Sequence, residues 1–244
     1  MSYDQQKLNR TTPPPYMGGI GSGNVARSLN TVMKKVYVRM FVGLLISAFC
    51  ALGVASSPAA LSFFFGNKIM MWGMPIAMLA MAILIPVRLN KMSTSTCIIL
   101  FGVYAALMGC WLAPIFIAYK IGTIVYTFFI TAGTFGAMSV YGYFTKSDLT
   151  KFGTYLIMAL FGLIIASIVN IFVASSAFDW IISIAGVLIF TGLTAWDTQQ
   201  IRRMSEMSLD SATSDKLATM GAFNLYLDFI NLFLYILRIF GGRD

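Results

Sequence analysis

Seven long apolar blocks dominate this sequence and leave few folds open to it. They lie at approximately 36–56, 69–87, 97–119, 121–144, 152–177, 180–201 and 217–240. About 20 apolar residues in a helix cross a hydrocarbon core of roughly 30 Å, and every block is close to that length or longer. The blocks lack the alternation of apolar and polar residues that a membrane β-strand requires. The pattern predicts an all-α integral membrane protein with seven transmembrane helices.

Charge content agrees with this class. Only 11% of the residues are charged and 58% are apolar, whereas a soluble domain has roughly 25% charged residues. A single water-facing globule is therefore excluded, and the lipid bilayer is the first partner that we expect.

The first 35 residues differ from the rest of the chain. They are polar and contain Pro13-Pro14-Pro15, followed by Gly18, Gly19, Gly21 and Gly23. Such a composition disfavours a packed element. We predict two parts: a disordered cytoplasmic tail over 1–35 and a seven-helix transmembrane domain over 36–244.

The distribution of basic residues sets the expected orientation. If the tail is cytoplasmic, only Lys68, Lys120, Arg238 and Arg243 of the 17 Lys and Arg residues lie on the opposite side. Basic residues concentrate in cytoplasmic loops of membrane proteins. We therefore expect a multi-pass protein of the cytoplasmic (inner) membrane with its N-terminus in the cytoplasm. Because these charges lie in short loops between apolar blocks, the net charge of +8 does not indicate nucleic-acid binding.

Histidine is absent from the sequence. This excludes His-dependent catalysis and removes the commonest zinc ligand. The three cysteines, Cys50, Cys97 and Cys110, are scattered through apolar blocks and are interpreted as small buried hydrophobes. We expect no enzymatic activity and no cofactor.

Two carboxylates stand apart because they lie inside apolar blocks. Asp197 lies about one turn before the basic end of the sixth block, and Asp228 lies near the middle of the seventh. A charged Asp at the centre of a membrane helix costs roughly 2.5–3.5 kcal/mol, and such residues usually face the bundle interior and mark a pathway.

Helical periodicity indicates where these carboxylates point. In the seventh block one stripe at spacings of three and four residues contains Gly221, Asn224, Asp228, Asn231, Tyr235 and Arg238. Thr194, Asp197 and Gln200 share a face of the sixth block in the same way. The two blocks are antiparallel neighbours, so the carboxylates can approach each other, with Asp228 several Å deeper if its helix starts at Leu217. A later start of that helix would improve the match.

Two carboxylates within hydrogen-bonding reach cannot both ionise cheaply, so they share a proton. The pair is then either a pH-sensitive switch that attracts cations or a purely structural hydrogen bond. Calcium prefers six to eight oxygens. Asp197 and Asp228, supported by Asn224, Asn231 and Thr194, would form a partial shell, which favours transient passage of Ca²⁺.

Two arginines allow alternative interpretations. Arg88, at the inner end of the second block, could reach the carboxylate pair as a latch, or it could be an ordinary basic anchor beside Lys91. Arg39, near the start of the first block, is expected to extend toward the lipid head groups.

Three segments resemble the Bax inhibitor (transmembrane Bax-inhibitor-motif) family. They are Phe190-Thr191-Gly192-Leu193-Thr194-Ala195-Trp196-Asp197-Thr198-Gln199-Gln200-Ile201, Tyr141-Gly142-Tyr143-Phe144-Thr145-Lys146-Ser147-Asp148-Leu149-Thr150 and Leu225-Tyr226-Leu227-Asp228-Phe229-Ile230-Asn231-Leu232-Phe233. The resemblance covers roughly residues 30 to 242. It implies seven helices in which the last is central and wrapped by the other six.

The resemblance also implies a function. Members of this family have a pH-dependent calcium leak governed by an aspartate pair, which corresponds to Asp197 and Asp228, and an arginine of the second helix, for which Arg88 is the candidate. The chain lacks a strongly charged C-terminal tail, which favours the bacterial branch.

Three functions remain open from the sequence. The first is a pH-sensitive leak channel for Ca²⁺ gated by protonation of the aspartate pair. The second is a membrane-embedded regulatory protein that modulates a protease or other membrane partners without transport, with the N-terminal tail as the contact. The third is a two-aspartate membrane protease, which the resemblance does not favour.

Overall fold

The computed structural model describes residues 22–207 and 211–241 of the 244-residue chain, and helices account for nearly all of them. In chain order the helices are α1 (Ser22–Ala55), α2 (Pro58–Gly66), α3 (Lys68–Arg88), the short 3₁₀ helix η3 (Leu89–Lys91), α4 (Thr94–Leu112), α5 (Ile115–Ala118), α6 (Ile121–Phe144), α7 (Thr150–Val173), α8 (Ser176–Met207) and α9 (Ser211–Phe240). Within these residues there are seven spans long and apolar enough to cross a membrane, with α4 and α5 forming one of them. The predicted all-α, seven-span membrane fold is confirmed.

Several boundaries differ from the prediction. α1 begins at Ser22, so residues 22–35, which we placed in the disordered tail, are helical. The reason lies in packing, because Val32 and Met33 are buried in the core. Residues 1–21, the remainder of the predicted tail, lie outside the described residues. The sequence also did not predict α2, which starts with Pro58 after the N-cap Ser57, a position that suits proline because its missing N–H is not needed there.

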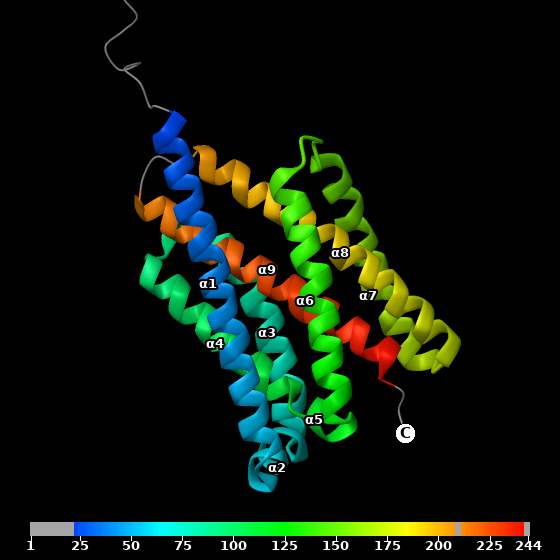
Figure 1. The fold of residues 1–244 in the computed structure, drawn as a ribbon. Helices are drawn as coiled ribbons and strands as arrows, with labels where there is room; N and C mark the ends of the chain where they lie inside the picture. The colour runs from blue at the N-terminus through cyan, green and yellow to red at the C-terminus, as the bar shows by residue number, and fades with distance from the viewer. Residues whose placement is uncertain (1–21, 208–210, 242–244) are drawn as a thin grey trace, which may run out of the picture.

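α9 is the most buried of the seven spans. In its most apolar stretch 67% of the residues are buried, against 44% for α8 and 6% for α7. It packs against α1, α4, α6 and α8. By contrast, α3 packs mainly on α4, and α7 packs mainly on α8. In Figure 1, α8 and α9 run obliquely across the bundle while α1 and α6 stand more upright. Asp228 therefore lies on the most buried of the seven spans.

Aromatic rings join α9 to α4. Phe101 and Tyr104 of α4 contact Phe223 and Tyr226 of α9 in edge-to-face pairs, with ring centroids 4.9 to 6.2 Å apart. Such pairs contribute about 0.5–1.5 kcal/mol each beyond the area that they bury. The Tyr226 hydroxyl also lies 2.7 Å from Ser47 Oγ of α1. One turn of α9 thereby holds α9 to both α4 and α1.

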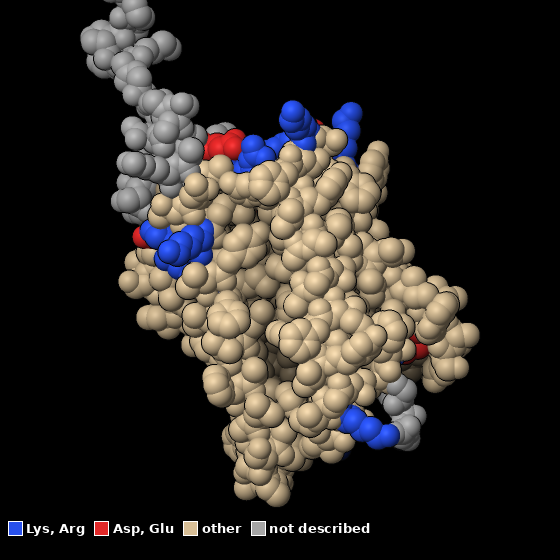
Figure 2. Space-filling model, viewed as in Figure 1, with Lys and Arg blue, Asp and Glu red and all other residues tan. Residues whose placement is uncertain are grey.

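Most Lys and Arg side chains visible in Figure 2 gather at one end of the molecule, where α1 and α9 begin, and we call it the basic end. Here Lys35 Nζ lies 2.8 Å from Asp215 Oδ1. Arg39 donates to the Asp215 carbonyl oxygen at 2.6 Å and to Thr219 Oγ1 at 2.8 Å. The expectation that Arg39 extends to the lipid head groups is wrong, because α9 starts early enough to present Asp215 to it.

Candidate carboxyl-pair site

The structure brings Asp197 of α8 and Asp228 of α9 together. Asp197 is 9% exposed and Asp228 is 5% exposed, and their carboxyl groups lie within hydrogen-bonding reach of each other. Asp228 Oδ2 is buried and has no hydrogen-bond partner among the described residues. A buried carboxyl oxygen without a partner is costly, so the arrangement favours a proton held between the two side chains.

Two glycines set the register of α8 against α9. A Cβ on Gly186 would lie 2.6 Å from the ring of Tyr235, and a Cβ on Gly221 would lie 2.8 Å from Ile201 Cγ1. No real Cβ tolerates such distances, so these glycines let the helices close on both sides of the pair. In the register that these two contacts define, Asp228 of α9 lies opposite Thr194 of α8. Thr194 precedes Asp197 by three residues, so the two aspartates are offset by about 4.5 Å along the helix axis.

This offset agrees with the expectation that Asp228 and Asp197 differ in depth by several Å, but the later start of the last helix that would improve the match does not occur. α9 starts earlier, at Ser211, and α8 continues to Met207. The carboxyls meet nonetheless, because the contacts at the glycines rather than the helix ends fix the offset.

The predicted polar stripe of α9 faces α8. Tyr235 stacks on Phe190 with ring centroids 5.9 Å apart. Arg238 Nη1 lies 3.3 Å from Asp179 Oδ1 at the end opposite the basic end. The stripe therefore forms one interface, with Asp228 as its central polar member.

The predicted supporting residues bond mainly to their own helices. Thr194 Oγ1 donates to the Phe190 carbonyl and Asn231 Nδ2 donates to the Leu227 carbonyl, each at 2.8 Å. Asn224 is half-buried. The described residues contain no group of three or more His, Cys, Asp or Glu side chains that could hold a metal ion. The carboxyl pair is thus a small polar site rather than a full cation shell.

Arg88 does not join the pair in this structure. It is exposed at the end of α3, which packs mainly on α2 and α4. The described residues show no ion pair or hydrogen bond between Arg88 and either aspartate. The position matches a basic anchor rather than the predicted latch.

The sequence did not predict that Gln199 of α8 binds the loop between α6 and α7 and that Arg202 binds the end of α6. Gln199, 4% exposed, accepts from the Leu149 N–H at 2.9 Å and donates to the Ser147 carbonyl at 2.8 Å. Arg202 donates to the Tyr143 carbonyl. Both segments were recognised as motifs, but the sequence contains no signal that they touch. This loop fixes the part of α8 that directly follows Asp197.

Asp148 in this loop has a depressed pKa. Donation from the Thr150 hydroxyl and N–H, together with Arg203 at 2.8 Å, lowers the pKa of Asp148 to about 2. Because the folded-state pKa lies below the usual value of about 3.9, the stabilisation is complete above about pH 5 and is lost as the pH falls through about 2.

Asp148→Asn is therefore expected to lower the thermal unfolding temperature at pH 6 and to have little effect near pH 2. Thermal unfolding of parent and variant in detergent, followed from pH 6 to pH 2, measures this difference in unfolding temperature. A difference between parent and variant that stays constant down to pH 2 would contradict the assignment.

Comparison with known proteins extends the sequence resemblance. A profile of the family described as "Inhibitor of apoptosis-promoting Bax1" matches residues 29–244. The inner membrane protein YbhL of Escherichia coli K12 is 46% identical over 217 residues, covering 88% of this chain and 93% of that protein. Uncharacterized proteins of Borreliella burgdorferi and Rickettsia prowazekii are 47% and 42% identical, with 88% of this chain covered in each case and 93% and 91% of those proteins. With seven membrane-spanning helices and a family match over nearly all of them, the chain belongs to the Bax inhibitor family of membrane proteins.

Proposed function

We propose that this protein is a pH-sensitive leak for cations, most specifically Ca²⁺, gated by the Asp197–Asp228 pair. The observation that carries the proposal is a pair of contacting carboxyls buried between the two most buried spans. Acids at such depth in a membrane protein commonly belong to a proton or ion pathway.

The proposed gate works through one proton. With a proton between them, the two carboxyls hold α8 to α9 by a hydrogen bond. When that proton is lost, two negative charges face each other in a buried site, where repulsion is strong. The helices then separate locally, and the exposed oxygens attract a cation.

Calcium is proposed as the transported ion and not as a bound cofactor. Two carboxylates supply fewer oxygens than the six to eight that Ca²⁺ prefers, so the ion retains water and leaves readily. Nothing in this scheme requires catalysis or a cofactor, and we propose neither.

We propose that the basic end faces the cytoplasm, which places the N-terminus inside. The bias of Lys and Arg toward this end supports that orientation. A location in the bacterial inner membrane is supported by the name of the Escherichia coli relative.

Flux into liposomes loaded with a calcium-sensitive dye tests the function. The parent protein should leak Ca²⁺ at a rate that rises with pH. Asp197→Asn and Asp228→Asn should each change this pH dependence, because an amide cannot share a proton with the one carboxyl that remains. The matched control is Asp179→Asn, the same change on α8 at the exposed pair with Arg238, and its pH profile should follow that of the parent.

Two outcomes count against the proposal. Equal leakage of the parent and both pair variants at every pH would show that the pair is not the gate. Liposomes that stay tight at every pH would favour the regulatory alternative, in which the protein acts on membrane partners without transport.

A further inference from the structure

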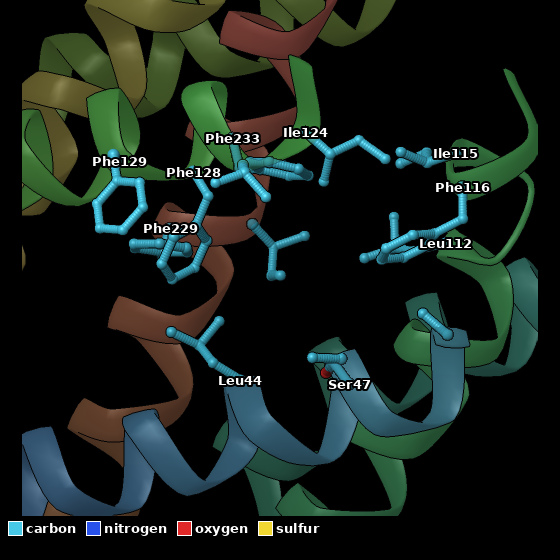
Figure 3. A pocket seen from close by; sticks show the side chains of 14 residues that line it. Leu44, Ser47, Leu112, Ile115, Phe116, Ile124, Phe128, Phe129, Phe229 and Phe233 are labelled. Carbon is cyan, nitrogen blue, oxygen red and sulfur yellow. The ribbon is translucent and has the colours of Figure 1, made fainter. Parts of the chain in front are cut away.

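A second feature of the bundle lies away from the carboxyl pair, in the half opposite the basic end. It is a cavity of about 370 Å³ between α1, α6 and α9, closed at one end by α4 and α5. Figure 3 shows Leu44 of α1 facing Phe128 of α6 across this space, with Phe229 of α9 beside them. α1 and α6 both pack on α9, and in this half the cavity separates them.

The lining of the cavity is apolar. Thirteen of its fourteen lining residues are Ala, Val, Leu, Ile or Phe, and the exception is Ser47. The Ser47 hydroxyl is fully used, because it donates to the Ala105 carbonyl at 2.7 Å and lies 2.7 Å from the Tyr226 hydroxyl. No hydrogen-bonding group of the lining side chains is left over, so the cavity suits a hydrocarbon and disfavours a polar ligand or water.

The cavity is open toward the side of the bundle. Val125 and Phe129 on its α6 wall are 48% and 68% exposed, and Ala48 on its α1 wall is exposed as well. All lining residues belong to membrane-spanning segments. The medium at this opening is therefore the hydrocarbon core of the bilayer. In Figure 2, which has the same view as Figure 1, the surface is hollowed between α1 and α6.

The size of the cavity selects its occupant. One turn of an α-helix with its side chains, about 10 Å across and 5.4 Å long, already fills roughly 400 Å³, so a helix of a partner protein does not fit. An apolar cavity of roughly 150 Å³ holds a molecule of benzene. The present cavity is more than twice that size, which suits a flexible chain of several methylene groups.

We propose that this cavity binds one acyl chain of a membrane phospholipid, which enters sideways between α1 and α6 and rests on Phe229 and Ile230 of α9. Leaving the space empty would forfeit dispersion contacts along fourteen side chains. Because Phe229 directly follows Asp228, the bound chain packs on the turn of α9 that carries this member of the carboxyl pair. The proposal concerns binding only, and it stands or falls independently of the cation leak.

Photolabelling tests the proposal. The full chain is reconstituted in liposomes that contain a phosphatidylcholine with a diazirine on its acyl chain, irradiated, digested and mapped by mass spectrometry. Phe229 and Ile230 are only 4% and 5% exposed, so a chain must enter the cavity to label them. We expect labelling at these residues at least several-fold above that at Leu225 and Leu232, which lie on the same helix but outside the cavity.

Ala48→Phe places a ring in the cavity and should reduce the labelling of Phe229 and Ile230 by about fivefold or more. The matched control is Ala77→Phe on the exposed face of α3, where the same change should leave the labelling unaltered. If Ala48→Phe fails to fold, the labelling of Phe229 and Ile230 in the parent protein still tests whether a chain occupies the cavity. If lipid-facing residues such as Phe41 are labelled in the parent while Phe229 and Ile230 are not, no chain occupies the cavity and the proposal is wrong.

Discussion

Asp228→Leu should lower the free energy of unfolding by about 1.5–3 kcal/mol, and Asp197→Leu should do the same. Each change leaves the other carboxyl buried without a partner. Leucine has nearly the shape of aspartate, so the packing between α8 and α9 is preserved. The double variant removes both polar groups together and should be close to the parent, because no orphaned carboxyl remains. The four proteins form a double-mutant cycle, measured by denaturant titration in mixed detergent micelles.

The matched control for this cycle is Asp179→Leu. This carboxylate is on the same helix, but it is partly exposed in its pair with Arg238. Pairs of that kind contribute about 0–1 kcal/mol, so its loss should be small. Additive effects of Asp197→Leu and Asp228→Leu would mean that the two carboxyls do not interact in the membrane domain.

Gly142→Ala should cost about 1–3 kcal/mol of stability, although alanine is the better helix former. The added Cβ would overlap the carbonyl oxygen of Ala195. This atom belongs to the α8 backbone and cannot rotate away, so α6 and α8 must separate. Their separation also strains the bond from Arg202 to the Tyr143 carbonyl and the hold of Gln199 on the loop. Denaturant titration and thermal unfolding both report the loss.

Gly133→Ala on the same helix is the control, because a Cβ there would meet no atom within 4 Å. This variant should be neutral or slightly more stable than the parent. If Gly142→Ala matches it, the close approach of α6 and α8 does not contribute to stability.

Elements with a strong local signal could be predicted from the sequence. The block at 121–144 coincides with α6, because Lys120 and Thr145 interrupt the apolar run at both ends. Boundaries failed where burial overrides local composition. The start of α1 is the clearest case, since Val32 and Met33 need a core supplied by other helices before their stretch becomes helical.

The candidate site divides in the same way. The cost of an acid in hydrocarbon and the helical stripe identified Asp197 and Asp228 and assigned them to facing helices. Helical periodicity could not give their offset along the helix axes, because it determines the face of a helix but not its register against a neighbour. Contacts at Gly186 and Gly221 determine that register.

By itself the sequence determined that this chain forms seven membrane helices and that two of them carry buried acids, because hydrophobicity and periodicity are local properties of a segment. Only the tertiary structure decided that the acids meet, that Arg88 lies away from them and that Arg39 binds Asp215. It alone also revealed the apolar cavity beside the turn after Asp228. Each of these depends on distances between helices far apart in the chain, and such distances follow from how side chains fit together across the bundle.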